Sequence, residues 1–142
     1  MIELLKELHG RKISNVIAGG SNGSIIIFDV DDNYVLFIYC SWRLCLVGDV
    51  LVTSNDNNDA NTGLLTTEIK KLIDSQIETI NINEFNDLII KFYSNKILYV
   101  FSNINVDASE SQYDENWSVA DKSKNLVFTI NEKNKILKSN YY

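Results

Sequence analysis

The side chains most often recruited for catalysis and metal binding are scarce in this chain. His9 is the only histidine, and Cys40 and Cys45 are the only cysteines. His9 stands beside Gly10 at the end of a predicted helix, where an imidazolium would simply interact well with the helix dipole. No Ser, Cys or Asp around it forms the pattern of a catalytic triad. Because a structural zinc site needs four Cys or His ligands, we predict no zinc site.

Three polar segments imitate known sites but are better explained as turns. Residues 57–61 with Glu68 space their oxygen atoms like a calcium loop, yet Thr62 stands where that loop needs glycine. Residues 29–33 suit a hairpin turn, and residues 19–23 lack the Lys-Ser/Thr ending of a phosphate loop. We therefore predict no catalytic residue, no metal and no cofactor, and we expect the chain not to be an enzyme. A pair of carboxylates acting as acid and base stays open, because their separation in space is invisible in sequence.

Composition and charge narrow the classes of partner. The chain has 142 residues, of which 45% are hydrophobic and 23% charged, as expected of one soluble globular domain. Its net charge of −6 argues against a nucleic-acid ligand, which needs clustered Lys and Arg, and favours cationic partners. No apolar run approaches the roughly 20 residues of a membrane span, and no signal-peptide pattern opens the chain, so we expect a cytoplasmic location. The two cysteines are predicted to be buried free thiols, because five-residue spacing on one strand points them to opposite faces.

The two parts of the chain resemble each other, which predicts an internal duplication with units 1–63 and 64–142. Residues 35–39 match residues 97–101 after a turn two residues shorter in the second unit, and a tryptophan follows each run, Trp42 and Trp117. Chance similarity between strands rich in Ile and Phe is the alternative. Apolar residues of the first unit recur 64 positions later: Leu8, Ile13, Val16, Ile25, Ile26 and Phe28 become Leu72, Ile77, Ile80, Ile89, Ile90 and Phe92.

Periodicity predicts a mainly β (α+β) fold. Apolar residues at helical spacing predict short helices at residues 2–8 and 65–73. Alternating and apolar runs bounded by Gly, Asn and Asp predict strands at 12–18, 24–29, 34–40, 42–53, 76–82, 87–93, 96–102, 116–120 and 125–131. Two related antiparallel β units, each with one apolar face, are expected to pack as a sandwich or a partly open barrel, with one or two short helices.

An acidic and aromatic segment is the best candidate for a binding surface. Residues 107–117 interrupt the second unit and contain four acids, a tyrosine and a tryptophan, the mixture of anchors and charge found at protein interfaces. Trp117 also matches Trp42, which favours a core position for it, and the alternative for Tyr113 is that it covers the edge of that ring. The predicted partner-binding residues are Asp107, Glu110, Tyr113, Asp114 and Glu115, with a second acidic site at Asp56 and Asp59 in the Asn-rich loop.

One family resemblance spans most of the chain. The motif LHGRKI at residues 8–13, SWRL at 41–44 and ENWSV at 115–119 look like small bacterial immunity proteins of contact-dependent growth inhibition and polymorphic toxin systems. These families share no diagnostic active-site motif. The resemblance implies a cytoplasmic antidote that binds one cognate toxin domain, a basic nuclease, and blocks it stoichiometrically.

The alternative is a β barrel or sandwich that binds a small molecule. A large apolar cavity lined by Tyr34, Phe37, Tyr39 and Tyr99 would favour that reading, whereas a filled core would not.

Overall fold

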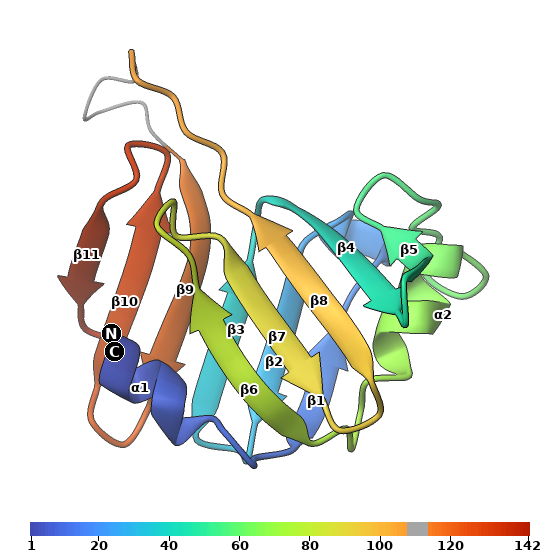
Figure 1. Ribbon diagram of the computed structural model, residues 1–142, viewed down its shortest axis with the longest axis horizontal. Coiled ribbons are helices and arrows are strands. Elements are labelled where there is room, and N and C mark those ends of the chain that lie inside the picture. The colour runs from blue at the N-terminus through green and yellow to red at the C-terminus, as the bar shows by residue number, and fades with distance from the viewer. Residues whose placement is uncertain (108–113) are drawn as a thin grey trace.

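Two antiparallel β-sheets pack face to face in the computed structural model, which describes residues 1–107 and 114–142 (Figure 1). The six-stranded sheet has the order β1 (Ile13–Ile17), β2 (Ile26–Val30), β3 (Tyr34–Ile38), β9 (Glu115–Asp121), β10 (Leu126–Asn131) and β11 (Ile136–Ser139). The five-stranded sheet has the order β5 (Asp49–Thr53), β4 (Ser41–Leu46), β8 (Lys96–Phe101), β7 (Leu88–Phe92) and β6 (Ile77–Ile82). The predicted mainly β fold and sandwich packing are confirmed.

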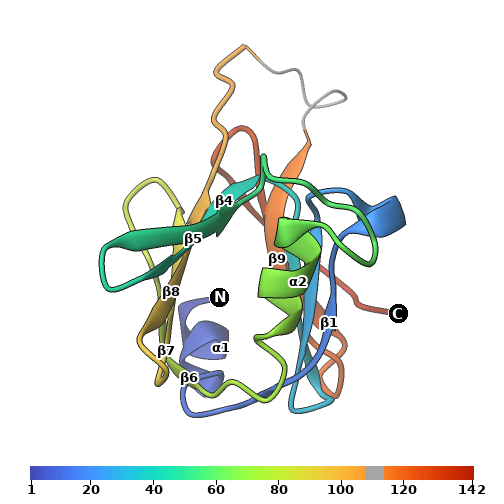
Figure 2. The ribbon, with the colours of Figure 1, turned by 90° about the vertical axis from the view of Figure 1, so that its right-hand side faces the viewer.

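Two short helices close the sides between the sheets. The first, α1 (Ile2–Glu7), contacts β6 and β9, and the second, α2 (Leu64–Lys70), contacts β5 and β1 (Figure 2). Leu5 of α1 and Leu65 and Ile69 of α2 enter the core, where Leu8 after α1 and Leu72 after α2 are also fully buried. Burial of one such leucine stabilises the fold by about 1.5–3 kcal/mol. No helix among the described residues is long and apolar enough to cross a membrane.

Each sheet is assembled from both halves of the chain. After β1, β2 and β3 have formed one part of the six-stranded sheet, the chain crosses at residues 39–40, and β4 and β5 join the other sheet. The second half builds β6, β7 and β8 in the five-stranded sheet and then returns with β9 to β11. The pairs that join the halves are β3 with β9 and β4 with β8.

The two tryptophans occupy corresponding places in this arrangement. Trp42 on β4 lies opposite Val100, and Trp117 on β9 lies opposite Ile38. Each indole N–H donates a 2.8 Å hydrogen bond to a backbone carbonyl just before a strand, that of Ser24 for Trp42 and that of Asn86 for Trp117. Both rings are buried, so Trp117 is a core residue. Duplication as the origin of this correspondence stays a prediction.

The register corrects the predicted alignment of the two units. Ile13 pairs with Val30 and Ile77 pairs with Phe92, so Val30 corresponds to Phe92, and the proposed match of Phe28 to Phe92 is wrong by two positions. Both hairpin turns have three residues, 31–33 and 93–95, so the length difference lies in the preceding connection instead. A two-residue shift leaves each side chain on the same face of its strand, and the apolar pattern therefore cannot detect it.

Two strand predictions also need correction. Residues 42–53 form a hairpin, β4 and β5, rather than one strand, with Val47 (φ 46°) and Gly48 (φ 84°) both left-handed at its turn. A β-branched valine rarely adopts that conformation, so the apolar run hides the turn. Strand β11 was not predicted because its side chains are all exposed and show no apolar alternation.

Candidate functional site: an acidic cavity at one end of the sandwich

A cavity of about 490 Å³ opens at the end of the sandwich drawn uppermost in Figure 1. It lies where β3 crosses to β4, between the end of β8 and the beginning of β9. We call it the acidic cavity and define it by two aromatic rings and three carboxylates: Tyr39, Phe101, Asp114, Glu115 and Glu132. Its lining also contains Asn103 and Asn116.

A buried asparagine holds the wall of the acidic cavity together. The backbone carbonyl of Asn116 accepts hydrogen bonds from the N–H groups of Tyr39 (2.9 Å) and Cys40 (3.1 Å) at the crossing between the sheets. Its side-chain Oδ1 accepts from the N–H of Asn103 at 2.9 Å, and its Nδ2 donates to the carbonyls of Asn103 (2.9 Å) and Asn131 (3.1 Å). One side chain thereby ties together the ends of β8, β9 and β10.

Backbone hydrogen bonds bring the three carboxylates to one rim. The N–H of Glu132 donates to the carbonyl of Asp114 at 3.0 Å, and Glu132 Oε1 accepts from Asn103 Nδ2 at 3.1 Å. Asp114 and Glu115 are exposed beside it. The described lining contains no Lys, Arg or His, and the sequence has neither Lys nor Arg from Ile97 to Asp121. A negative potential therefore collects at this opening, although two cations stand just outside the lining: Lys133 follows Glu132, and the Arg43 guanidinium lies 5.2 Å from the centre of the Phe101 ring.

Two titratable side chains in the wall keep their protons at neutral pH. Burial raises the pKa of the Tyr39 hydroxyl, and the nearby Glu115 carboxylate raises it further. Burial raises the pKa of the Cys40 thiol to about 12, with a smaller contribution from Asp87. Because the thiolate is the nucleophile, Cys40 is not activated for covalent chemistry. The arrangement is suited to accepting hydrogen bonds and positive charge from a partner.

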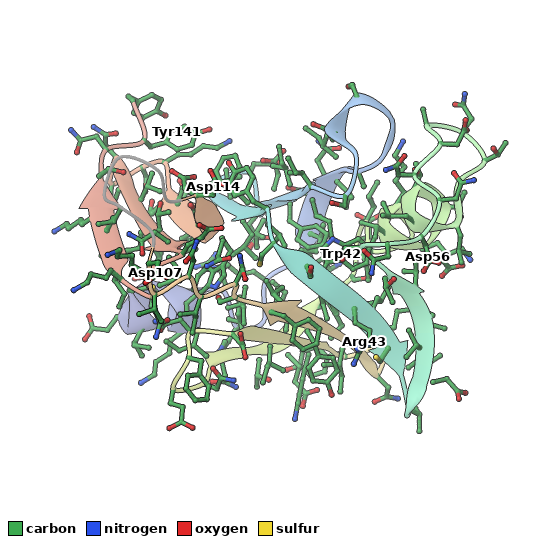
Figure 3. All side chains as sticks on the ribbon, turned by 90° about the horizontal axis from the view of Figure 1, so that it is seen from above. Trp42, Arg43, Asp56, Asp107, Asp114 and Tyr141 are labelled. Carbon is green, nitrogen blue, oxygen red and sulfur yellow. The ribbon has the colours of Figure 1, made fainter. Side chains whose placement is uncertain are left out.

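The structure brings together only part of the predicted acidic surface. Asp114 and Glu115 line the acidic cavity, and Asp107 is exposed in the turn that leads from β8, with its N–H bonded to Asn105 Oδ1 at 3.2 Å. Figure 3 shows Asp107 and Asp114 toward the β9 side of this end, with Asp56 on the opposite side of Trp42. Glu110 and Tyr113 lie outside the described residues.

The sequence reasoning missed Glu132, Tyr39 and Phe101 as members of this site. Glu115 pairs with Asn131 across the hairpin of β9 and β10, which places Glu132 beside Asp114. Pairing the two predicted strands 116–120 and 125–131 would have supplied that signal. Tyr39 and Phe101 occupy matching positions after runs 35–38 and 97–100, so the predicted alignment of those runs already connected them.

The second predicted acidic site is separate and stabilises its own loop. Asp56 Oδ2 accepts hydrogen bonds from the N–H (2.8 Å) and hydroxyl (3.3 Å) of Thr53. Asp59 Oδ1 accepts from the N–H groups of Thr62 (2.9 Å) and Asn61 (3.0 Å) and from the Thr62 hydroxyl, and these bonds lower the pKa of its carboxyl. Neither residue lines the acidic cavity, so a contact with a partner at this loop stays a prediction.

The remaining chemical candidates do not assemble into another site. His9 Nε2 lies 3.2 Å from the carbonyl of Ile80 and lines no part of the acidic cavity. Over residues 1–107 and 114–142, no group of three His, Cys, Asp or Glu side chains could hold a metal ion. Both cysteines are half-buried and free.

The aromatic residues proposed for a small-molecule cavity lie on different surfaces. Tyr34 is buried and donates its hydroxyl to Glu7 at 3.2 Å, beside α1. Phe37 lies on the outer face of the six-stranded sheet, and Tyr99 lies on the outer face of the other sheet. Tyr39 alone lines the acidic cavity, so the four do not enclose a common apolar space.

Comparisons with known proteins leave the site to be interpreted from its geometry. No family model, no curated protein and no solved structure matched this chain.

Proposed function

We propose that this chain is an immunity protein that binds a cognate bacterial toxin domain, a basic nuclease, and neutralises it by forming a one-to-one complex in the cytoplasm. The observation that carries the proposal is the acidic cavity, in which three carboxylates and two aromatic rings converge with no cation among the described lining residues. In this proposal the chain works by occupying its partner rather than by catalysis.

The chemistry of the acidic cavity matches what a nuclease presents to its substrate. A nuclease binds phosphate through Lys and Arg, and Arg in particular forms paired hydrogen bonds with a carboxylate. Asp114, Glu115 and Glu132 offer such carboxylates at one rim, and Tyr39 and Phe101 add apolar surface that excludes water from the contact. Aromatic anchors beside charged pairs are the usual composition of strong contact regions in protein interfaces.

The electrostatics also support rapid capture of a basic partner. Opposite charges on two surfaces raise association rates from an ordinary 10⁵–10⁶ M⁻¹s⁻¹ to as much as about 10⁸–10⁹ M⁻¹s⁻¹ at low salt. With a net charge of −6 and a carboxylate-rich opening, this chain has the distribution that such steering requires. We expect the association rate to fall as salt is added, because mobile ions screen exposed charges.

The test uses the toxin domain encoded immediately upstream of this chain as the binding partner. We expect co-purification as a tight one-to-one complex and rescue of cells that express the toxin. The double variant Asp114→Lys with Glu115→Lys should lower the association rate roughly 10- to 100-fold at low salt. The matched control is Asp49→Lys with Glu78→Lys, which changes the charge equally at exposed positions on other strands. Absence of both complex and rescue removes the proposal, and equal effects of the two double variants remove the acidic cavity as the contact.

A further inference from the structure

A second surface of different character lies on the outer face of the five-stranded sheet. Trp42 and Leu44 point into the core, so the alternate residues of β4 point outward together with those of β8. They form a groove of about 510 Å³, which we call the outer groove, lined by Arg43, Cys45, Val47, Val50, Ile97 and Tyr99. The two helices lie between the sheets and cover neither outer face (Figure 2).

The six-stranded sheet provides an internal comparison for the outer groove. Ile97 pairs with Cys45 as Val35 pairs with Ala120, so these two pairs occupy corresponding positions. On the six-stranded sheet this outer pair is buried, with Val35 2% and Ala120 0% exposed, whereas Ile97 and Cys45 are only partly buried. At the margin of the groove, Val50 is 54% exposed. The five-stranded sheet thus leaves apolar surface open where its counterpart is covered.

One guanidinium gives this apolar surface a chemical preference. Among the described residues that line the groove, Arg43 alone is charged, and its guanidinium lies 5.2 Å from the centre of the Phe101 ring, which holds it in place. Within the described part of the chain Arg43 makes no ion pair. Lys91 pairs with Ile97 from the other side and adds a second cation on this face. An unpaired cation beside half-exposed apolar side chains is complementary to an anion with an apolar body.

We propose that the outer groove binds a small monocarboxylic acid with an apolar chain, its carboxylate on Arg43 and its chain along Cys45, Ile97 and Val50. Arg43 supplies paired N–H donors in the geometry that a carboxylate accepts. The volume of the outer groove lies within the range of roughly 300–1,000 Å³ that is usual for small-molecule sites. The outer groove and the acidic cavity share no lining residue and have opposite charge, but they are neighbours, because the Arg43 guanidinium lies beside the Phe101 ring.

The test is a titration of ¹⁵N-labelled protein with octanoate, and with octylammonium as a probe of the same chain length and opposite charge. We expect saturable shifts of amide signals in β4, β5 and β8 with octanoate. Octylammonium should bind at least roughly tenfold more weakly, because one charge-assisted hydrogen bond contributes about that factor to affinity. Arg43→Glu should reverse that preference, and Arg43→Gln should weaken octanoate about tenfold. The control is Lys138→Glu on β11, which changes the net charge by the same amount as Arg43→Glu but lies far from the groove, so it should leave both affinities unchanged.

Three results would overturn the inference. The first is equal binding of the two probes, because the guanidinium would then contribute nothing. The second is octanoate shifts confined to other strands. The third is octanoate binding that persists in Arg43→Glu while the remaining amide spectrum shows the variant to be folded. None of these outcomes depends on the toxin, so they bear on the outer groove alone.

Discussion

Replacement of Asn116 by alanine should weaken the whole fold, because this side chain bonds to two neighbouring segments at the acidic cavity. The variant loses three side-chain hydrogen bonds and leaves the Asn103 N–H and the carbonyls of Asn103 and Asn131 without that partner. At about 0.5–1.5 kcal/mol for each bond, the free energy of unfolding should fall by about 2–4 kcal/mol. That is a large part of the roughly 5–15 kcal/mol available to a domain.

A second variant at this position tests the same geometry through pH. Asn116→Asp retains an oxygen for the Asn103 N–H but turns its other oxygen toward two carbonyls and introduces a buried charge. Burial raises the pKa of the introduced carboxyl above its value of about 3.9 in the unfolded chain. The unfolded chain then loses its proton first as pH rises, so the penalty should be small below about pH 4 and large at pH 7.

Urea unfolding followed by tryptophan fluorescence measures all of these changes. The control is Asn105→Ala. Within the described residues its side chain makes one exposed bond, from the Asp107 N–H at 3.2 Å, so the free energy of unfolding should change by less than about 0.5 kcal/mol. A loss below about 1 kcal/mol in Asn116→Ala, or a penalty in Asn116→Asp that does not change with pH, would refute the reasoning.

Three further predictions concern side chains described above. Trp42→Phe and Trp117→Phe each leave a carbonyl without its 2.8 Å bond, so urea unfolding should show losses of about 1–3 kcal/mol for each; an effect in only one would contradict their equivalence. Burial alone would raise the pKa of the Asp121 carboxyl, but its hydrogen bonds and the Lys124 charge outweigh burial and lower that pKa. The stabilisation that the Asp121 carboxylate provides should therefore be present above about pH 4 and fade below it. The free energy of unfolding of Asp121→Asn should depend less on pH between about pH 3 and pH 7. At pH 8 a thiol reagent should modify Cys40 roughly a thousandfold more slowly than an ordinary thiol, because a pKa of about 12 leaves roughly one thiolate in ten thousand. Labelling of folded Cys45→Ser, in which Cys40 is the remaining thiol, at an ordinary rate would contradict this.

The fold class could be predicted because it depends on local pattern. Short apolar runs bounded by Asn and Asp or by Ser and Asn, such as 34–38 and 96–101, predict strands, and the structure has strands at both places. The helical spacing of residues 2–8 and 65–73 likewise predicted both helices. Such signals need only neighbours in sequence, which is why they can be found without knowing any long-range contact.

The pairing of strands could not be predicted in the same way. Nothing in the apolar pattern of 34–38 distinguishes a neighbour at 41–46 from the true one, β9, because each offers the same alternation. The acidic cavity depends on that pairing. Asp114 and Glu115 could be proposed from composition, but Tyr39 and Glu132 join them only through contacts between distant segments.

The exchange of strands between the sheets has a consequence for synthesis on the ribosome. The five-stranded sheet is encoded without interruption from Ser41 to Phe101, so all its strands are available once that segment has emerged. The six-stranded sheet must wait, since β3, which already pairs with β2, gains its second neighbour only when residues 115–121 appear. Until then the nascent protein presents a bare apolar strand edge, the kind of surface on which aggregation begins. Strands β9, β10 and β11, which are synthesised last, therefore complete the sheet that β1, β2 and β3 begin and cover the exposed edge of β3.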